Sequence, residues 1–322
     1  MIQTFEDYKI QRYNILESNF LTETSKFFRK NLDTIRKNFL SELDSAISDA
    51  CKIQAAENKI CAYISISFLN TSVMENKPVF QIDFYNEDWV YGESWARKRF
   101  NADFMLTYWQ EFISKAMDDK FYIRSQISKV EIKSLFWDTL DKLIYLFAGY
   151  TKYFLRDISC DLLKAENFYV TCGTYLDWQE RIFAELPEID LLNLEANEDT
   201  TFRPVNKKIF RHKNFDGLNL RNCYFKNCTF DRFTFSKINL VDSKFLNCRF
   251  TNTEFIDTNF KGGNFFKCYF KDCNFTNCNS SADNIPDEEY FSILKISDCY
   301  LLNLNFFDCN FSQIEKINCF EK

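Results

Sequence analysis

The C-terminal part of the chain repeats a large apolar residue at every fifth position. In the stretch NCYFKNCTFDRFTFSKINLVDSKFLNCRFTNTEFIDTNF, residues 222–260, a Phe or Leu stands at each position divisible by five. Helices repeat an apolar face about every 3.6 residues and strands every 2, so neither element fits. Thirteen consecutive positions, here called centres, follow the rule: Phe215, Leu220, Phe225, Phe230, Phe235, Leu240, Phe245, Phe250, Phe255, Phe260, Phe265, Phe270 and Phe275.

A second selected position lies two residues before each centre, and from Ser243 onward it is always small. The remaining positions hold mostly Asn, Lys, Asp, Arg and Thr, which favour water. Two inward positions followed by a polar corner describe a chain that turns repeatedly around one axis and buries a continuous apolar column. Because Cys228, Cys248 and Cys268 recur at twenty residues, we expect four sides in each coil.

Residues 214–320 closely resemble the pentapeptide-repeat family, because these in-register repeats carry the large and small residues that define its motif. The resemblance implies an all-β right-handed quadrilateral parallel β-helix, a solenoid of stacked coils. The pattern lapses after Phe275 and resumes at Cys299 with Leu301. Since Phe265 and Leu301 are 36 residues apart, we expect one coil of twenty plus a sixteen-residue inserted loop near 281–297. The charged Lys316 and Glu321 stand at the last two expected centres.

The first 200 residues show a different pattern. Apolar residues spaced by three and four over 24–56 predict a long amphipathic helix, with Thr24 as a possible cap. Alternating residues over 62–68 and 80–84 predict two strands, and residues 167–172 predict a third. Further helical patterns occupy 103–117 and 129–156. We therefore expect an α+β domain over 1–200 with helices packed on a sheet, a junction over 201–213, and the solenoid over 214–320.

Composition and charge narrow the function classes. The chain has net charge −6, while residues 211–279 hold 11 Lys and Arg against 6 Asp and Glu. Some pentapeptide-repeat proteins protect type II topoisomerases by imitating DNA, which requires dense negative charge. These coils have the opposite sign, so a DNA mimic of the quinolone-resistance kind stays an alternative only. The negative charge of the whole chain also disfavours nucleic acid as the partner.

The thirteen cysteines are expected to be structural. The sequence shows no signal-peptide pattern, and its most apolar run, LIYLFAGYTKYFL, is too short to span a bilayer and is interrupted at Lys152. We therefore expect a cytoplasmic, bacterial protein whose solenoid thiols stay reduced and fill the small inward positions. No metal or cofactor is expected. Cys172, followed by Gly173, is the best nucleophile candidate, and His212 is the sole histidine, but neither lies in a catalytic motif.

The favoured function is a non-enzymatic protein- or peptide-binding scaffold that presents a rigid β-helical surface. A further alternative is an effector-like protein, or an N-terminal enzyme with the solenoid as adaptor. With a sixteen-residue insert, the residues that follow successive centres form an outward column that either the insert or a partner covers. The binding candidates are this column, Lys226, Leu246, Phe266 and Leu302, together with Tyr224, Tyr269 and Lys271.

Overall fold

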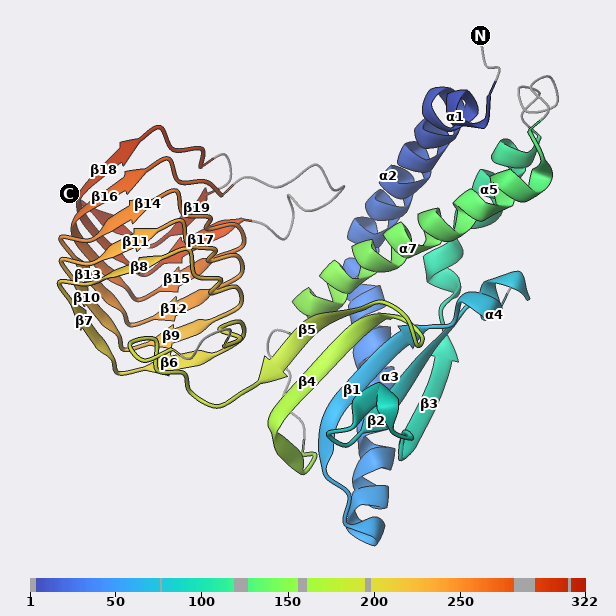
Figure 1. Ribbon diagram of the computed structural model, residues 1–322, viewed down its shortest axis with the longest axis horizontal. Helices are drawn as coiled ribbons and strands as arrows, with labels where there is room; N and C mark the ends of the chain where they lie inside the picture. The colour runs from blue at the N-terminus through green and yellow to red at the C-terminus, as the bar shows by residue number, and fades with distance from the viewer. Residues whose placement is uncertain are drawn as a thin grey trace. The chain divides into compact units, whose positions relative to one another are not determined.

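The computed structural model describes residues 4–75, 77–118, 127–155, 161–194, 198–280, 293–311 and 314–322. The chain forms two compact units, Met1–Ala184 and Glu185–Lys322 (Figure 1). The first unit is an α+β domain and the second is a four-sided parallel β-helix.

The first unit is built on a five-stranded sheet with strand order β3-β2-β1-β4-β5. β1 pairs antiparallel with β2 and parallel with β4, with Ile66 opposite both Ile82 and Cys172. The predicted strands over 62–68, 80–84 and 167–172 are confirmed as β1, β2 and β4. The strands are β1 Cys61–Phe68, β2 Val79–Tyr85, β3 Ala96–Asn101, β4 Lys164–Thr174 and β5 Gln179–Glu185.

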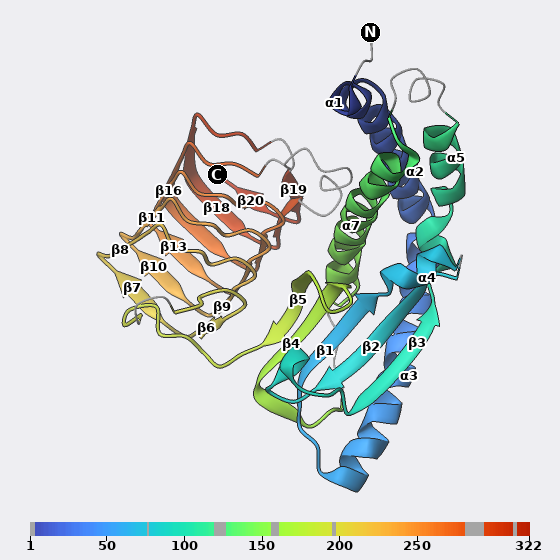
Figure 2. The same ribbon diagram turned by 45° about the vertical axis from the view of Figure 1, so that its right-hand side comes forward.

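Long helices cover one face of this sheet (Figure 2). α3 packs on β2 and β3, and α7 packs on β4, so the alternating apolar residues of the strands are buried. The Phe147 ring lies 5.1 Å from Phe80 and 6.0 Å from Phe39, which joins both helices to the sheet. The helical segments are α1 Phe5–Tyr8, η1 Lys9–Tyr13, α2 Asn14–Lys30, α3 Leu32–Glu57, α4 Asn70–Met74, η2 Trp89–Tyr91, η3 Asp103–Leu106, α5 Trp109–Met117 and α7 Lys129–Phe154.

The helix predicted over 24–56 is two helices, and the cap assigned to Thr24 is wrong. Thr24 is fully buried inside α2, which begins at Asn14. Asn31 separates α2 from α3 because its backbone leaves the helical region (φ −110°, ψ 16°). Its side-chain amide donates to the carbonyl of Phe27, 2.8 Å away. The apolar spacing continues across this break, and therefore the pattern alone predicted one helix.

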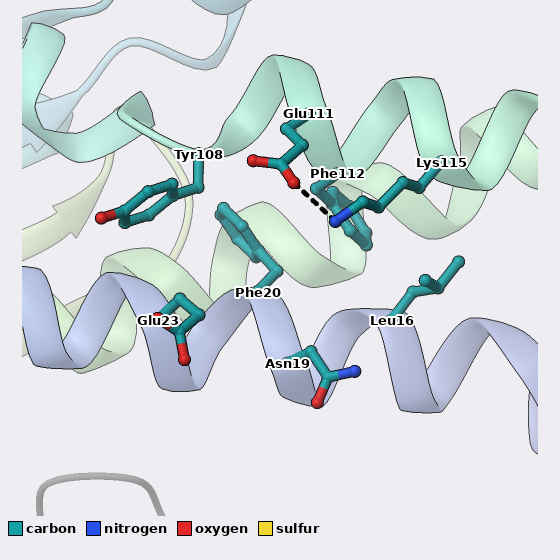
Figure 3. Close-up of a pocket in the computed structure, with 8 residues that line it drawn as sticks. All are labelled: Leu16, Asn19, Phe20, Glu23, Tyr108, Glu111, Phe112 and Lys115. Carbon is teal, nitrogen blue, oxygen red and sulfur yellow. Dashed lines mark hydrogen bonds and ion pairs between the residues drawn. The ribbon is translucent and has the colours of Figure 1, made fainter.

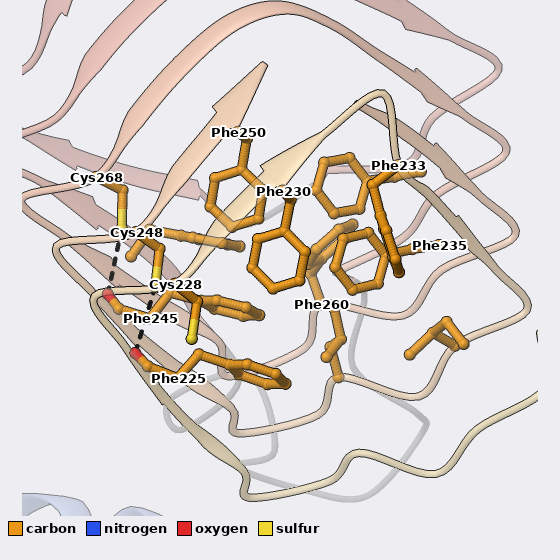
Figure 4. Packing of buried hydrophobic residues seen from close by; sticks show 14 of the residues in the cluster. Phe225, Cys228, Phe230, Phe233, Phe235, Phe245, Cys248, Phe250, Phe260 and Cys268 are labelled. Atoms are coloured by element: carbon orange, nitrogen blue, oxygen red, sulfur yellow. Dashed lines mark hydrogen bonds between the residues drawn. The ribbon is translucent and has the colours of Figure 1, made fainter. Parts of the chain in front are cut away.

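In the second unit short strands stack at an interval of twenty residues. Phe225, Phe245 and Phe265 occupy the same register position in β9, β12 and β15, and their rings stack 4.6 Å apart (Figure 4). The four predicted sides are confirmed, three by strands and the fourth by isolated bridges between stacked asparagines. The strands are β6 Pro204–Asn206, β7 Ile209–Arg211, β8 Asn214–Asp216, β9 Tyr224–Lys226, β10 Thr229–Asp231, β11 Thr234–Ser236, β12 Lys244–Leu246, β13 Arg249–Thr251, β14 Glu254–Ile256, β15 Asn264–Phe266, β16 Tyr269–Thr276, β17 Leu294–Ser297, β18 Tyr300–Phe307, β19 Ile314–Ile317 and β20 Phe320–Glu321.

The corners explain why polar residues follow each centre. The second residue after most centres has a left-handed backbone, as at Asn227 (φ 56°) and Asn247 (φ 52°). Asn and Asp tolerate this conformation better than most other side chains. The N–H of Asn227 donates to the carbonyl of Leu246 in the next coil, 2.9 Å away. Each corner therefore both turns the chain and joins it to its neighbour.

The solenoid begins earlier than expected, and the prediction that residues 201–213 are a junction is wrong. This range contains β6 and β7, whose centres Val205 and Phe210 are buried beneath Phe225 and Phe230. Ile189 and Leu191, which precede these strands, are also buried in the solenoid core. They cover the apolar interior of the first coil.

The predicted insert length of sixteen residues is also wrong. Phe265 pairs with Ile296 and Phe270 with Leu301, each 31 residues apart, so the insertion adds eleven residues to a coil of twenty. Within the expected loop 281–297, residues 294–297 form β17 in regular register. Of the four insert residues predicted to cover the outward column, Tyr290 and Phe291 lie among residues 281–292, outside the described residues. The other two are Ile293 and Leu294, and Leu294 is buried in the solenoid core instead.

Candidate functional site

The structure divides the seven predicted binding residues between two outer surfaces of the solenoid. Tyr269, Lys271 and Leu302 point outward from β16 and β18. The other four, Tyr224, Lys226, Leu246 and Phe266, lie on β9, β12 and β15. The predicted column is therefore corrected, because Leu302 pairs with Lys271, and Ser297 takes its place beside Phe266.

The first surface, here called the tyrosine face, is formed by the outward residues of β10, β13, β20 and the N-terminal halves of β16 and β18. The Arg249 guanidinium lies 4.4 Å from the centre of the Tyr269 ring. The Tyr269 and Tyr300 rings are 6.4 Å apart, and Tyr300 and Phe320 are 5.9 Å apart. The tyrosine face thus carries a continuous row of one cation and three aromatic rings.

Strand geometry places this row on the outside. Each member lies one residue before a centre, and neighbouring side chains in a strand point to opposite faces. Centres Phe250, Phe270 and Leu301 are buried, whereas Tyr300 is 55% exposed and Phe320 is 53% exposed. Large exposed aromatic residues in contiguous groups mark interaction surfaces more often than single ones do.

Basic residues accompany the aromatic row. Lys271 lies beside Leu302 in the parallel column that follows the centres, and both Lys271 and Arg249 are exposed. Asp231 is the acidic member of that column, and its carboxylate lies 4.0 Å from the Arg211 guanidinium. The central part of the tyrosine face is consequently basic and aromatic.

The second surface, here called the leucine face, lies over β9, β12 and β15. Its column runs from Lys226 through Leu246 and Phe266 to Ser297. Lys226 is exposed, while Leu246 and Phe266 are partly buried. The Lys267 ammonium lies 4.9 Å from the centre of the Phe266 ring. The leucine face therefore has two adjacent apolar side chains, Leu246 and Phe266, whereas the tyrosine face has a row of three aromatic rings.

The first unit has a shallow hollow between α2 and α5, of about 100 Å³ (Figure 3). Its apolar base includes Phe20 and Phe112, whose rings stack 4.9 Å apart. At its rim the Lys115 ammonium contacts the Glu111 carboxylate at 2.5 Å. These residues pack one helix against another, and none of the eight that line the hollow is a Cys, Ser, Thr or His.

Cys172 and His212 belong to different units and have ordinary structural roles. Cys172 is fully buried in β4, and burial raises the pKa of its thiol to about 12. The thiolate needed for nucleophilic attack is therefore scarce near neutral pH. His212 is exposed at a solenoid corner, with its Nε2 atom 3.3 Å from an Arg232 nitrogen. Cys172 is therefore a core residue and His212 a surface residue.

The small inward residues share one hydrogen-bonding role. The Cys248 thiol donates to the carbonyl of Phe225 and the Cys268 thiol to that of Phe245, at 3.5 and 3.3 Å (Figure 4). The Ser243 hydroxyl makes the equivalent bond to Leu220 at 2.6 Å. A small side chain with one donor meets this requirement, which explains why Cys, Ser and Thr alternate there. Burial raises the pKa of the Cys273 thiol to about 11.

Metal-binding clusters and membrane-spanning helices are both absent from the described part of the chain. Within it, no three His, Cys, Asp or Glu side chains come together as a metal site. None of its helices combines the length and hydrophobicity needed to cross a bilayer.

Comparison with known proteins agrees with the geometry of the second unit. Residues 234–272 match the family model of pentapeptide repeats, with eight copies. Because the same geometry continues from β6 to β20, the C-terminal unit is a pentapeptide-repeat β-helix. No curated protein matches the chain.

Several solved structures are similar at low sequence identity. The pentapeptide repeat protein Rfr23 from the cyanobacterium Cyanothece 51142 is 12% identical, with 38% of this chain and 90% of that chain covered and a TM-score of 0.32. QnrB1, a plasmid-mediated fluoroquinolone resistance protein, is 10% identical over 42% and 89%, with a TM-score of 0.19. HetL, involved in heterocyst differentiation regulation in Nostoc sp. strain PCC 7120, is 5% identical over 36% and 88%, with a TM-score of 0.12.

Proposed function

We propose that this chain is a non-enzymatic binding protein whose tyrosine face holds a segment of a protein partner. The observation that carries the proposal is the row Arg249, Tyr269, Tyr300 and Phe320, which leaves two aromatic rings about half exposed. Aromatic and Arg side chains dominate the energetics of protein interfaces. The continuous parallel ladder beneath them fixes their spacing before binding, which reduces the entropy lost on association.

The charge of the tyrosine face favours a partner segment that alternates apolar and acidic residues. Lys271 and Arg249 flank the aromatic rings and would meet carboxylates, while Leu302 and the rings would meet apolar side chains. Opposite charges at the rim accelerate association and set orientation more than they raise affinity. We therefore expect binding to weaken as salt concentration rises.

The test is affinity capture followed by direct binding of the purified partner. Truncation of an interface aromatic residue often costs about 2 kcal/mol, or roughly 30-fold in affinity. Tyr300→Ser is expected to lose at least tenfold. Phe266→Lys, on the leucine face, serves as the matched control and is expected to stay within twofold. Equal losses in both variants, or a captured species that is nucleic acid, would contradict the proposal.

A DNA-mimic function has weaker support. The regular coils over 211–279 hold 11 basic and 6 acidic residues, and the exposed aromatic row adds no negative charge. B-DNA carries one negative charge per about 1.7 Å along its axis, which these coils do not approach. We therefore place topoisomerase protection second.

A further inference from the structure

The aromatic core of the solenoid changes at its last complete coil. Phe245 and Phe265 stack 4.6 Å apart, and the next residue in that column is Ile296. Phe250 and Phe270 also stack 4.6 Å apart, and their column continues with Leu301. Ile and Leu have smaller side chains than Phe, so the interior of this coil is incompletely filled.

A chamber of about 190 Å³ occupies this end of the solenoid. Its inner wall is the last complete layer of phenyl rings, including Phe260 and Phe275, and its outer wall includes Phe306. Phe306 stacks 5.0 Å from Phe275 but is 49% exposed, because it lies at the open edge. Apolar cavities of about 150 Å³ stay dry and accept benzene. This chamber therefore has room for a small hydrocarbon group.

One charged residue lines the chamber. Lys316 stands at a centre, the inward position that an apolar residue fills elsewhere, and it pairs in register with Ile296 of the previous coil. Its ammonium group reaches the Glu321 carboxylate, 2.8 Å away. The two side chains are 41% and 54% exposed, and such exposed ion pairs contribute only about 0–1 kcal/mol. An incoming anion would therefore compete with the Glu321 carboxylate for the Lys316 ammonium, and the weakness of the exposed ion pair permits that exchange.

We propose that the chamber is a binding site for a small amphiphile with a carboxylate head and an apolar tail of about six to eight carbons. The tail would fill the space between Phe275 and Leu301, and the carboxylate would meet Lys316. A long Lys stem with a charged tip suits this boundary between apolar wall and water. The site is independent of the tyrosine face, since its lining residues point into the solenoid.

The experiment measures binding of octanoate and octanol to the full chain by calorimetry. Ile296→Phe extends the column of stacked Phe245 and Phe265 rings by one more ring, which would fill the chamber. Leu301→Trp fills it from another side, while Leu302→Trp puts the same ring on the neighbouring outward position as a matched control. Lys316→Met removes the head-group contact and keeps an apolar stem, and Lys295→Met is its control on the adjacent strand.

The expected result is octanoate binding at least fivefold tighter than octanol binding. Ile296→Phe and Leu301→Trp should each weaken it at least tenfold, with Leu302→Trp and Lys295→Met within twofold. Lys316→Met should reduce octanoate binding to the level of octanol. Unchanged octanoate binding in folded Ile296→Phe would overturn the proposal. A dimer that forms through this end and excludes octanoate would also overturn it, by making a second copy the occupant.

Discussion

Phe250→Ala tests the stacked interior most directly. Phe250 is fully buried, and its ring is nearly parallel to Phe230 at 5.0 Å and to Phe270 at 4.6 Å. It also meets Phe245 and Phe255 at 5.6 and 5.8 Å. The substitution removes a ring from a column with neighbours above, below and beside it.

The size of the effect follows from this environment. Replacing a buried Phe by Ala costs about 3–5 kcal/mol, because apolar surface is lost and a cavity remains. Aromatic pairs add about 0.5–1.5 kcal/mol beyond area burial, and hydrogen-bonded coils on both sides limit collapse. We therefore expect about 4–5 kcal/mol for Phe250→Ala. Phe306→Ala is the matched control, since Phe306 has one stacked neighbour and is half exposed, and we expect about 1 kcal/mol.

The two units are distinguished by urea unfolding followed with two signals. All five tryptophans lie in the first unit, at positions 89, 95, 109, 137 and 178, so their fluorescence reports that unit alone. Far-UV circular dichroism reports both units. With a urea dependence of about 2 kcal/mol per molar, Phe250→Ala should lower the solenoid midpoint by about 2 M.

The result that would refute this reasoning is equally specific. Similar losses in Phe250→Ala and Phe306→Ala would mean that the interior rings are not continuously packed. A shift in the tryptophan fluorescence transition, with no change in the circular dichroism transition of the solenoid, would mean that the substitution perturbs the first unit instead of the solenoid.

Three further predictions concern thiols, pH and topoisomerases. Burial raises the pKa of the Cys223 and Cys278 thiols to about 12. Both should therefore resist iodoacetamide at pH 8 until the protein unfolds. Rapid labelling of the native protein, measured by mass spectrometry, would contradict this prediction. Burial raises the pKa of the Cys172 thiol from its ordinary value of 9.0 to about 12 in the folded protein. Its contribution to stability is therefore fully present below pH 9 and is lost as pH rises towards 12. Wild type should therefore lose more unfolding free energy between pH 9 and 12 than Cys172→Ala, by up to about 4 kcal/mol, and parallel pH profiles would refute the assignment. In a gyrase supercoiling assay with a quinolone, the chain should give no protection, and rescue at stoichiometric protein would make DNA mimicry the better account.

The sequence predicted the solenoid because one rule acts at every coil. Each centre must fill the same interior, so the Phe column is visible without a structure. The repeat pattern is harder to recognise where a residue other than Phe or Leu fills the centre, or where a large residue stands at the small position. Val205 begins the first coil with Arg203 at its small position, and Ile296 resumes the pattern with the larger Leu294 at its own. Neither coil matches the repeat pattern, so the sequence predicts too late a start for the solenoid and too long an insert.

The same offset explains why the candidate binding residues divide between two faces. Five residues make one side of the solenoid, so an insert that is five residues too long places Leu302 on the leucine face, although it lies beside Lys271 on the tyrosine face. The position of Tyr300 and Phe320 on the tyrosine face depends on the strand register across the insertion, and the spacing of residues in the sequence does not determine that register. In the first unit, the sequence pattern predicts Thr24 as a cap because it does not show that the helix already begins at Asn14.

The most direct test of the binding account is site-specific photocrosslinking of the captured partner. Benzoylphenylalanine placed at Leu302 lies on the tyrosine face, and the same group at Leu246 lies on the leucine face. The account predicts strong crosslinking from position 302, competed by excess unlabelled protein, and little from position 246. Crosslinking from 246 with none from 302 would contradict it.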